Sequence, residues 1–271
     1  MSNTKTVTPV FGNIGDKPLS SREMMALIIK LSIPSILAQI SATIMQYIDA
    51  AMVGSLGTSA TGAIGLVAST TWLFNGLCMA IATGFSVQVA QLIGADRGAE
   101  AKNVLRQSLI VCLISGIIIG SIASFISFYL PTWLGGKEDV LAGAHSYFLV
   151  FATAIPFNLM RVLTGNMLQC AGDMRTPSIL NASMCGLDVI FNYFLIFPTR
   201  TVSLLGFEFT VWGAGNGVAG AAMGTALSEV FVAIIMLFIV CFRAPALRIT
   251  RGGSWRLTVP CLRTALKVAV P

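Results

Sequence analysis

The chain has 271 residues, of which 55% are hydrophobic and only 10% are charged, with a formal net charge of +6. Soluble domains carry about 25% charged residues, so this composition excludes an ordinary soluble protein. The number of apolar runs also excludes a single signal peptide as their explanation, and we expect an all-α polytopic membrane protein.

Six apolar runs are long enough to cross a bilayer, which takes about 20 mostly apolar residues in a helix. They cover residues 25–53, 62–93, 105–131, 145–168, 177–197 and 216–242. A seventh run begins near Leu262 and reaches Pro271, the last residue. Because backbone groups in hydrocarbon must be hydrogen-bonded within their own segment, each run is expected to be a helix. The segments between them contain Gly, Pro and charge, as loops do.

The positive charges predict the orientation of this six-helix bundle. With the N-terminus in the cytoplasm, fifteen of the 17 Lys and Arg residues lie on or near the inner side, and only Lys137 and Arg200 lie outside. Lys and Arg concentrate in cytoplasmic loops of membrane proteins. We therefore expect a multi-pass protein of the plasma (inner) membrane. The net charge is explained by topology, and no nucleic-acid partner is needed.

Cysteine and histidine give no sign of a metal site. The six cysteines form no CxxC pair and four of them lie within apolar runs, so they are interpreted as free thiols. His145 is the only histidine, and the runs contain no His/Glu cluster and no serine-based catalytic motif. We expect no enzyme activity, no cofactor and no metal site beyond a possible sodium ion.

Three carboxylates lie inside the apolar runs: Asp49, Asp188 and Glu229. A charged carboxylate at the bilayer centre costs about 2.5–3.5 kcal/mol on insertion scales, so such residues are functional candidates by default. Simpler readings remain open for each. Asp49 could sit at the outer interface, and Asp188 could only hydrogen-bond a neighbouring helix. Glu229 follows the small residues of "GVAGAAMGTALSE", which indicate close helix packing, and it could stabilise that packing.

Asn192 follows Asp188 by four residues, so both lie on one face of a helix. Together they could coordinate a cation or share a proton. Removing a carboxylate from water favours its protonated form, which is the property that a proton-coupled transporter needs. Arg161 lies in the inner part of its run and could extend to the cytoplasm. Pro34 lies inside the first run and is expected to kink it.

Several segments in order resemble the multidrug and toxin extrusion (MATE) family of secondary transporters. They are "SIPSILAQISATIMQYIDAAMVGSLG", "VAQLIGADRGAEA", "LQCAGDMRTPSILN", "DVIFNYFLIFP" and "GVAGAAMGTALSE". The resemblance runs from about residue 20 to the end of the sequence. No single motif is specific, and the signal comes from five motifs in the right order at helix-scale spacing.

The resemblance implies a transporter of twelve helices in two six-helix lobes, which exports organic cations and other amphipathic compounds in exchange for protons or sodium ions. Asp49 matches the family's first-helix aspartate at a cation site, and Pro34 matches a proline associated with bending. Many members have Asn and then Asp four residues later, whereas here Asp188 precedes Asn192. Glu229 stands where members often have Gln. The candidate cation or proton site is therefore Asp49, Asp188, Asn192 and Glu229.

The expected organisation is that of one lobe. Residues 1–24 would form a cytoplasmic tail, 25–242 the N-terminal lobe, 243–261 a cytoplasmic linker and 262–271 the start of helix 7. "KLSIP" opens the first run and "KVAVP" ends the sequence, which is where a parallel second repeat would begin. The missing partner would then be the C-terminal lobe. Membrane lipid and an amphipathic or cationic small molecule are the other expected partners.

Two alternatives remain at this point. One is a flippase for lipid-linked oligosaccharides or polysaccharides in the same superfamily, whose cavity should be basic enough to meet a pyrophosphate, with Arg161 as the candidate residue. The other is a membrane enzyme or scaffold that does not transport. The second has little support, because the loops are too short for a catalytic domain.

Overall fold

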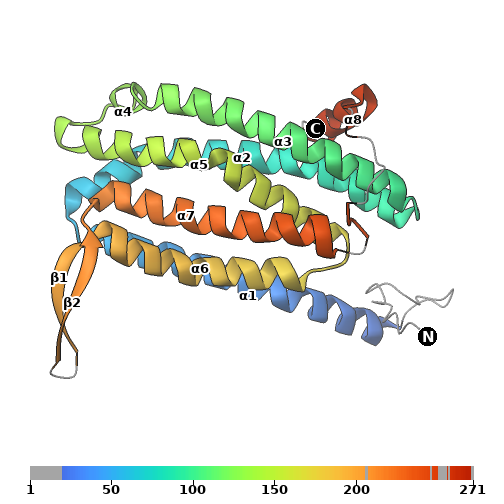
Figure 1. The fold of residues 1–271 in the computed structure, drawn as a ribbon, viewed down its shortest axis with the longest axis horizontal. Coiled ribbons are helices and arrows are strands. Elements are labelled where there is room, and N and C mark those ends of the chain that lie inside the picture. Colours follow the sequence, from blue (N-terminus) through green and yellow to red (C-terminus); the bar gives the residue numbers. More distant parts are fainter. Residues whose placement is uncertain (1–19, 205–206, 245, 250–254, 256, 270–271) are drawn as a thin grey trace.

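The computed structural model describes residues 20–204, 207–244, 246–249, 255 and 257–269, although some side chains within α1 and the strands fall outside the description. Its helices are α1 (Ser21–Gly54), α2 (Thr58–Gly94), α3 (Gly98–Ile126), α4 (Leu130–Trp133), α5 (Glu138–Cys170), α6 (Arg175–Ile196), α7 (Gly217–Phe238) and α8 (Val259–Ala269), with a short π-helix (Ile239–Arg243) continuing α7. Figure 1 shows the long helices lying side by side along the length of the molecule.

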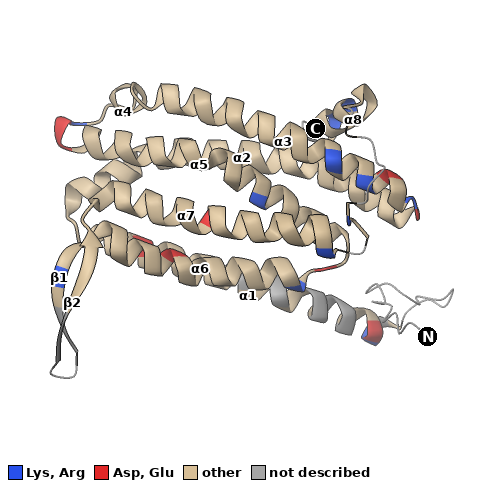
Figure 2. Ribbon diagram, in the orientation of Figure 1, with Lys and Arg blue, Asp and Glu red and all other residues tan. Residues whose placement is uncertain are grey.

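Five of the described helices, α2, α3, α5, α6 and the α7 segment, are long and apolar enough to cross a membrane. This confirms the prediction of an all-α polytopic membrane protein. The 34-residue helix α1 covers the run expected at 25–53. In the bundle, α5 packs against α2, α3 and α7, and α6 packs between α7 and α1. Charged residues gather at the two ends of the bundle, with few between them (Figure 2).

Two helices begin about two turns earlier than the apolar runs suggest. Helix α3 begins at Gly98 instead of residue 105, and α5 begins at Glu138 instead of residue 145. The added turns are polar: Arg97 and Glu100 form an exposed ion pair at 2.7 Å beside the start of α3. Helical hydrogen bonding does not require apolar side chains, so a membrane helix continues past the apolar stretch.

A β-hairpin replaces the long linker expected between the fifth and sixth runs. Strands β1 (Pro198–Leu204) and β2 (Phe207–Ala214) pair antiparallel, with Val202 opposite Phe209. Figure 1 shows the hairpin projecting from one end of the bundle. At its base, the Arg200 guanidinium lies 4.2 Å from the ring centre of Phe197 and 4.5 Å from that of Tyr193.

Glycines set the closest helix contacts. A Cβ on Gly116 of α3 would lie 2.8 Å from the Pro156 Cα atom on α5. On α7, a Cβ on Gly220 would overlap the carbonyl of Leu195, and one on Gly224 would overlap the side chain of Asn192. These contacts confirm the close packing predicted from the small residues of this helix.

The chain after α7 returns to the bundle. Helix α8 packs against α2, where the Gln88 side-chain amide donates to the Cys261 carbonyl at 3.2 Å. It covers most of the run expected to begin at Leu262, while Pro271 lies outside the described residues. The expected tail at 1–24 also lies outside the description up to residue 19. Pro34 lies within α1, but its side chain is not described, so the kink there stays a prediction.

Candidate functional site

Asp49, Asp188 and Asn192 form one cluster, called here the carboxylate cluster. The Asn192 side-chain nitrogen Nδ2 donates to Asp49 Oδ1 at 2.8 Å and to Asp188 Oδ2 at 3.0 Å. Asp188 and Asn192 are fully buried, whereas Asp49 is half-buried. The spacing of four residues therefore does place Asp188 and Asn192 on one face of α6, and that face meets α1.

Helix α7 closes the carboxylate cluster from the other side. The absence of a side chain at Gly224 lets α7 approach the Asn192 side chain closely. One turn further on, Ser228 Oγ lies 2.6 Å from the Gly224 carbonyl and 3.4 Å from Asp188 Oδ1. A hydroxyl has one proton, and the shorter distance favours its donation to the carbonyl, so Asp188 gains little from Ser228.

The electrostatics of the carboxylate cluster favour a bound positive charge. Two carboxylates share one amide donor in a largely buried space, and buried charges are costly unless they are paired. The Asn192 oxygen Oδ1 is buried and has no hydrogen-bond partner among the described residues. Hard cations take carboxylate and amide oxygens as ligands. The cluster can therefore accept a proton or a small hard cation between its oxygens.

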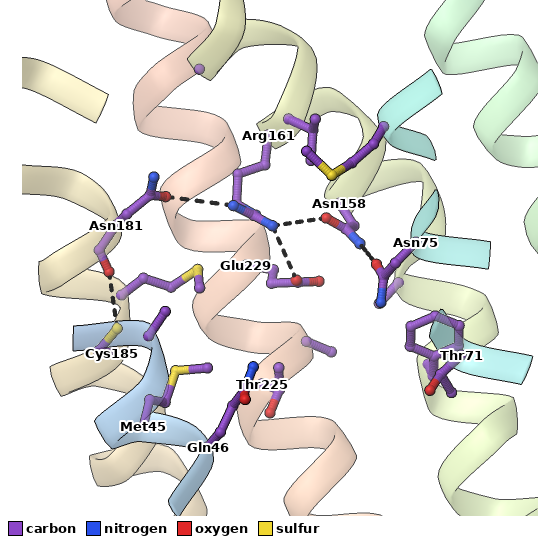
Figure 3. Close-up of a pocket in the computed structure, with 18 of the residues that line it drawn as sticks. Met45, Gln46, Thr71, Asn75, Asn158, Arg161, Asn181, Cys185, Thr225 and Glu229 are labelled. Atoms are coloured by element: carbon purple, nitrogen blue, oxygen red, sulfur yellow. Dashed lines mark hydrogen bonds and ion pairs between the residues drawn. The ribbon is translucent and has the colours of Figure 1, made fainter. Parts of the chain in front are cut away.

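Glu229 does not join the carboxylate cluster. Its Oε1 lies 3.6 Å from Nη2 of Arg161 on α5, and both side chains are partly exposed, at 15% and 19%. Arg161 also donates to Asn158 Oδ1 at 2.9 Å and, at the limit of 3.5 Å, to Asn181 Oδ1. Asn158 in turn donates to Asn75 Oδ1 on α2 at 2.6 Å. We call Arg161 and Glu229 the Arg161–Glu229 pair. Figure 3 shows this pair with Asn75, Asn158 and Asn181, which together come from four helices.

The Arg161–Glu229 pair lines a cavity of about 890 Å³. Polar side chains along this cavity include Gln39, Gln46, Thr71, Asn75, Tyr147, Asn158, Arg161, Asn166, Gln169, Ser178, Asn181, Thr225 and Glu229. The three members of the carboxylate cluster are not among the lining residues. The structure thus brings three of the four candidate residues together and assigns the fourth to a cavity.

The asparagines of the cavity were not identified from the sequence. Asn75, Asn158 and Asn181 are amides within apolar runs, and their polarity in those runs was the available signal. An amide carries no net charge and costs less than a carboxylate to place in a membrane helix, so it is a weaker sign of a functional site.

Two neighbouring residues on α7 contact different groups, the carboxylate cluster and Arg161. Ser228 lies against Asp188 on α6, and Glu229 pairs with Arg161 on α5. Helix α7 therefore contacts both the carboxylate cluster and the cavity.

This arrangement of helices has known counterparts. The family model MatE matches residues 34–194, which is more than half of the chain. The chain belongs to the MatE family. The match includes Asp49, Asp188 and Asn192 and ends before α7 begins.

Curated MatE relatives are similar over most of this chain. The probable multidrug resistance protein NorM of Thermotoga maritima is 24% identical over 252 residues, which cover 92% of this chain and 52% of that protein. The multidrug export protein MepA of Staphylococcus saprophyticus is 27% identical, over 89% of this chain and 50% of that protein. An FAD transporter of Shewanella oneidensis is 23% identical, over 66% of this chain and 40% of that protein. The chain thus spans about half the length of these relatives.

Solved structures agree on the fold. A MATE protein crystallised in complex with MaD3S has a TM-score of 0.77 and 26% identity, over 90% of this chain and 52% of that one. A MOP superfamily transporter from Pyrococcus furiosus has a TM-score of 0.78 and 24% identity, over 90% of this chain and 51% of that one. The helix arrangement described above is therefore that of one half of a MATE transporter.

Proposed function

We propose that the protein acts in secondary active efflux of amphipathic compounds, coupled to protons or sodium ions bound at the carboxylate cluster. The observation that carries this proposal is the Asn192 amide, which bridges Asp49 and Asp188 across two helices. A buried pair of carboxylates joined by a single neutral donor gains strongly from one positive charge.

The carboxylate cluster joins elements that an alternating-access cycle has to move. Asp49 belongs to α1, and Asp188 and Asn192 belong to α6. A bound ion shifts a conformational equilibrium only by its difference in affinity between the two states. An ion that draws the two carboxylates together would stabilise the packed α1–α6 arrangement, and its release would allow α1 to separate.

The wider assignment follows from the relatives and from the charge distribution. Relatives named for multidrug resistance and multidrug export support a drug-like cargo, with organic cations as the family resemblance implies. Lys and Arg gather at the end of the bundle near α8 (Figure 2), which supports a cytoplasmic location for that end and a plasma-membrane protein with its N-terminus inside. Residues 25–242 would form the N-terminal lobe, and a second lobe would complete the transport path.

The test is dye efflux by the full-length protein in everted membrane vesicles under imposed proton or sodium gradients. Asp49→Asn should abolish the dependence on the gradient, because the amide can neither bind a proton nor contribute a negative charge. Asp96→Asn is the matched control, since Asp96 is exposed and Asn tolerates its positive φ of 56°. Gradient-driven efflux that is undiminished in Asp49→Asn would overturn the proposal.

A flippase for lipid-linked oligosaccharides is the second candidate. Arg161 favours it as the only Lys or Arg among the described residues that line the cavity. The Glu229 carboxylate beside it neutralises that charge, which makes the cavity poorly suited to a pyrophosphate. Tight binding of a polyprenyl pyrophosphate, lost in Arg161→Ala, would support the flippase instead.

A further inference from the structure

The Arg161 guanidinium, which is only partly exposed, has few close hydrogen-bond partners among the described residues. Its Nε is buried and has no hydrogen-bond partner among the described residues, and its contact with Asn181 is long, at 3.5 Å. The 3.6 Å separation from Glu229 exceeds a normal charge-assisted hydrogen bond of about 2.7–2.9 Å. Arg161 thus has one short hydrogen bond, to Asn158, although a guanidinium has five N–H donors.

The two charges restrict which ligand the cavity accepts. An organic cation that pairs with Glu229 would lie beside Arg161 and compete with the guanidinium for its counter-charge. An anion that pairs with Arg161 would likewise compete with the Glu229 carboxylate for the guanidinium. A charge that loses its partner in a partly buried site has a desolvation cost that is not compensated. A ligand that carries both charges can pair with both residues at once.

The distance between the two residues sets the distance between the ligand's charges. Arg161 Nη2 and Glu229 Oε1 are 3.6 Å apart, so groups of one small ligand head can contact both residues at once only if they lie near each other. An ammonium and a carboxylate on the same carbon are separated by about 3 Å. Molecules with charges at opposite ends of a long body do not meet this condition.

Three aromatic side chains contribute to the lining of the cavity. Trp72 on α2 and Tyr147 and Phe151 on α5 line the same cavity. Aromatic rings prefer to pack against other rings in offset or edge-to-face arrangements. The volume of about 890 Å³ is within the range of small-molecule sites.

We propose that this cavity binds aromatic zwitterions with an amino-acid-like head group, whose carboxylate pairs with Arg161 and whose ammonium pairs with Glu229. Asn158 and Asn181 hold the guanidinium in position for the carboxylate. The inference rests on the proposed transport function and names its substrate class.

Three probes with the same aromatic body test the proposal: 3-(2-naphthyl)alanine, 3-(2-naphthyl)propionate, which lacks the amine, and 2-(2-naphthyl)ethylamine, which lacks the carboxylate. Equilibrium dialysis against the full-length protein in nanodiscs measures each Kd. The zwitterion should bind about tenfold or more tightly than either analogue, because each charged contact contributes about that factor.

Substitutions assign the two charges. In Glu229→Gln, naphthylpropionate should bind more tightly than it does to the wild type, so naphthylalanine should lose its advantage over it. In Arg161→Gln, naphthylethylamine should bind more tightly, so naphthylalanine should lose its advantage over that analogue. A gain in affinity cannot arise from misfolding. Arg175→Gln and Glu138→Gln are the controls, since both residues are exposed and lie outside the cavity lining. They should retain the wild-type order of affinities.

The proposal is overturned if wild-type protein binds naphthylethylamine as tightly as naphthylalanine, or if the preference for the zwitterion survives both cavity variants. Dialysis requires no ion gradient, so the result is separate from coupling. If gradient-driven efflux is intact but the protein shows no preference for the zwitterion, the zwitterion proposal is refuted and the coupled-transport proposal is retained. A zwitterion preference in a protein whose efflux ignores both gradients would remove the coupled-transport proposal alone.

Discussion

Asn192 donates its side-chain amide to Asp49 across the boundary between α6 and α1, with Nδ2 2.8 Å from Oδ1. The two residues are 143 positions apart in the sequence, so this hydrogen bond exists only in the packed bundle. Because the same nitrogen also bonds Asp188, one amide group holds both carboxylates.

Replacing this amide should separate the two carboxylates. Asn192→Leu leaves them without their shared donor, and we expect a loss of about 1–3 kcal/mol in stability for a hydrogen bond to a charged group. Thermal unfolding in detergent measures the change. Asn216→Leu is the matched control, because the Asn216 side chain is exposed and has only a long contact with the Met223 sulfur. Equal melting temperatures for the two variants would contradict the bridging role.

The close approach of α7 to α6 should depend on Gly224. In Gly224→Ala the new methyl group would overlap the Asn192 side chain and lie 2.9 Å from the Asn192 backbone nitrogen. We expect a destabilisation of about 1–3 kcal/mol from overpacking. Gly186→Ala on α6 has no atom within 4 Å of the added methyl group and should be neutral or slightly stabilising. Equal denaturation curves for these two variants would show that the contact is unimportant.

The base of the hairpin should depend on Arg200. Its guanidinium lies over the rings of Tyr193 and Phe197, and such contacts at exposed sites contribute about 0.5–1 kcal/mol. Arg200→Gln should therefore speed hydrogen–deuterium exchange of the β1 and β2 amides by about two- to fivefold. Lys137→Gln, which removes an exposed charge elsewhere, should leave the exchange unchanged. Unaltered exchange in Arg200→Gln would refute the role of these contacts.

The docking of α8 should depend on Gly84 of α2. A Cβ there would lie 2.5 Å from the Ala265 carbonyl oxygen, so Gly84→Ala should displace α8. Cys261 is 8% exposed in the docked helix and should then react faster with a maleimide. Peptide mass spectrometry isolates this cysteine from the other five. Gly76→Ala, with no atom within 4 Å, should not change the rate. Unchanged labelling of Cys261 in Gly84→Ala would show that α8 tolerates the methyl group.

Much of the fold could be predicted from hydrophobic run length, because the bilayer demands long apolar helices. The predicted boundaries are wrong outside the apolar runs. Helices begin there at Gly98 and Glu138 in polar sequence, and a strand begins at Pro198. The pairing of β1 with β2 depends on hydrogen bonds between strands, and length and apolarity carry no information about it.

The candidate site was predictable in part for a similar reason. The spacing of Asp188 and Asn192 places both on one helical face, which the structure confirms. The sequence around Glu229 is as apolar as that around Asp188 and Asn192. In the bundle, however, the Glu229 side chain lies against Arg161 on α5. Which helix faces which is a property of the packed bundle. The division into a carboxylate cluster and a cavity could not be obtained from the positions of charges along the chain.

Ser228 and Glu229 are successive residues, so their side chains leave α7 about 100° apart at nearly the same depth. A rigid turn of α7 about its axis cannot carry Ser228 away from Asp188 while leaving Glu229 fixed beside Arg161. The same holds for a slide along the axis. The contact of Ser228 with Asp188 and the ion pair of Glu229 with Arg161 therefore change together in any rigid movement of α7.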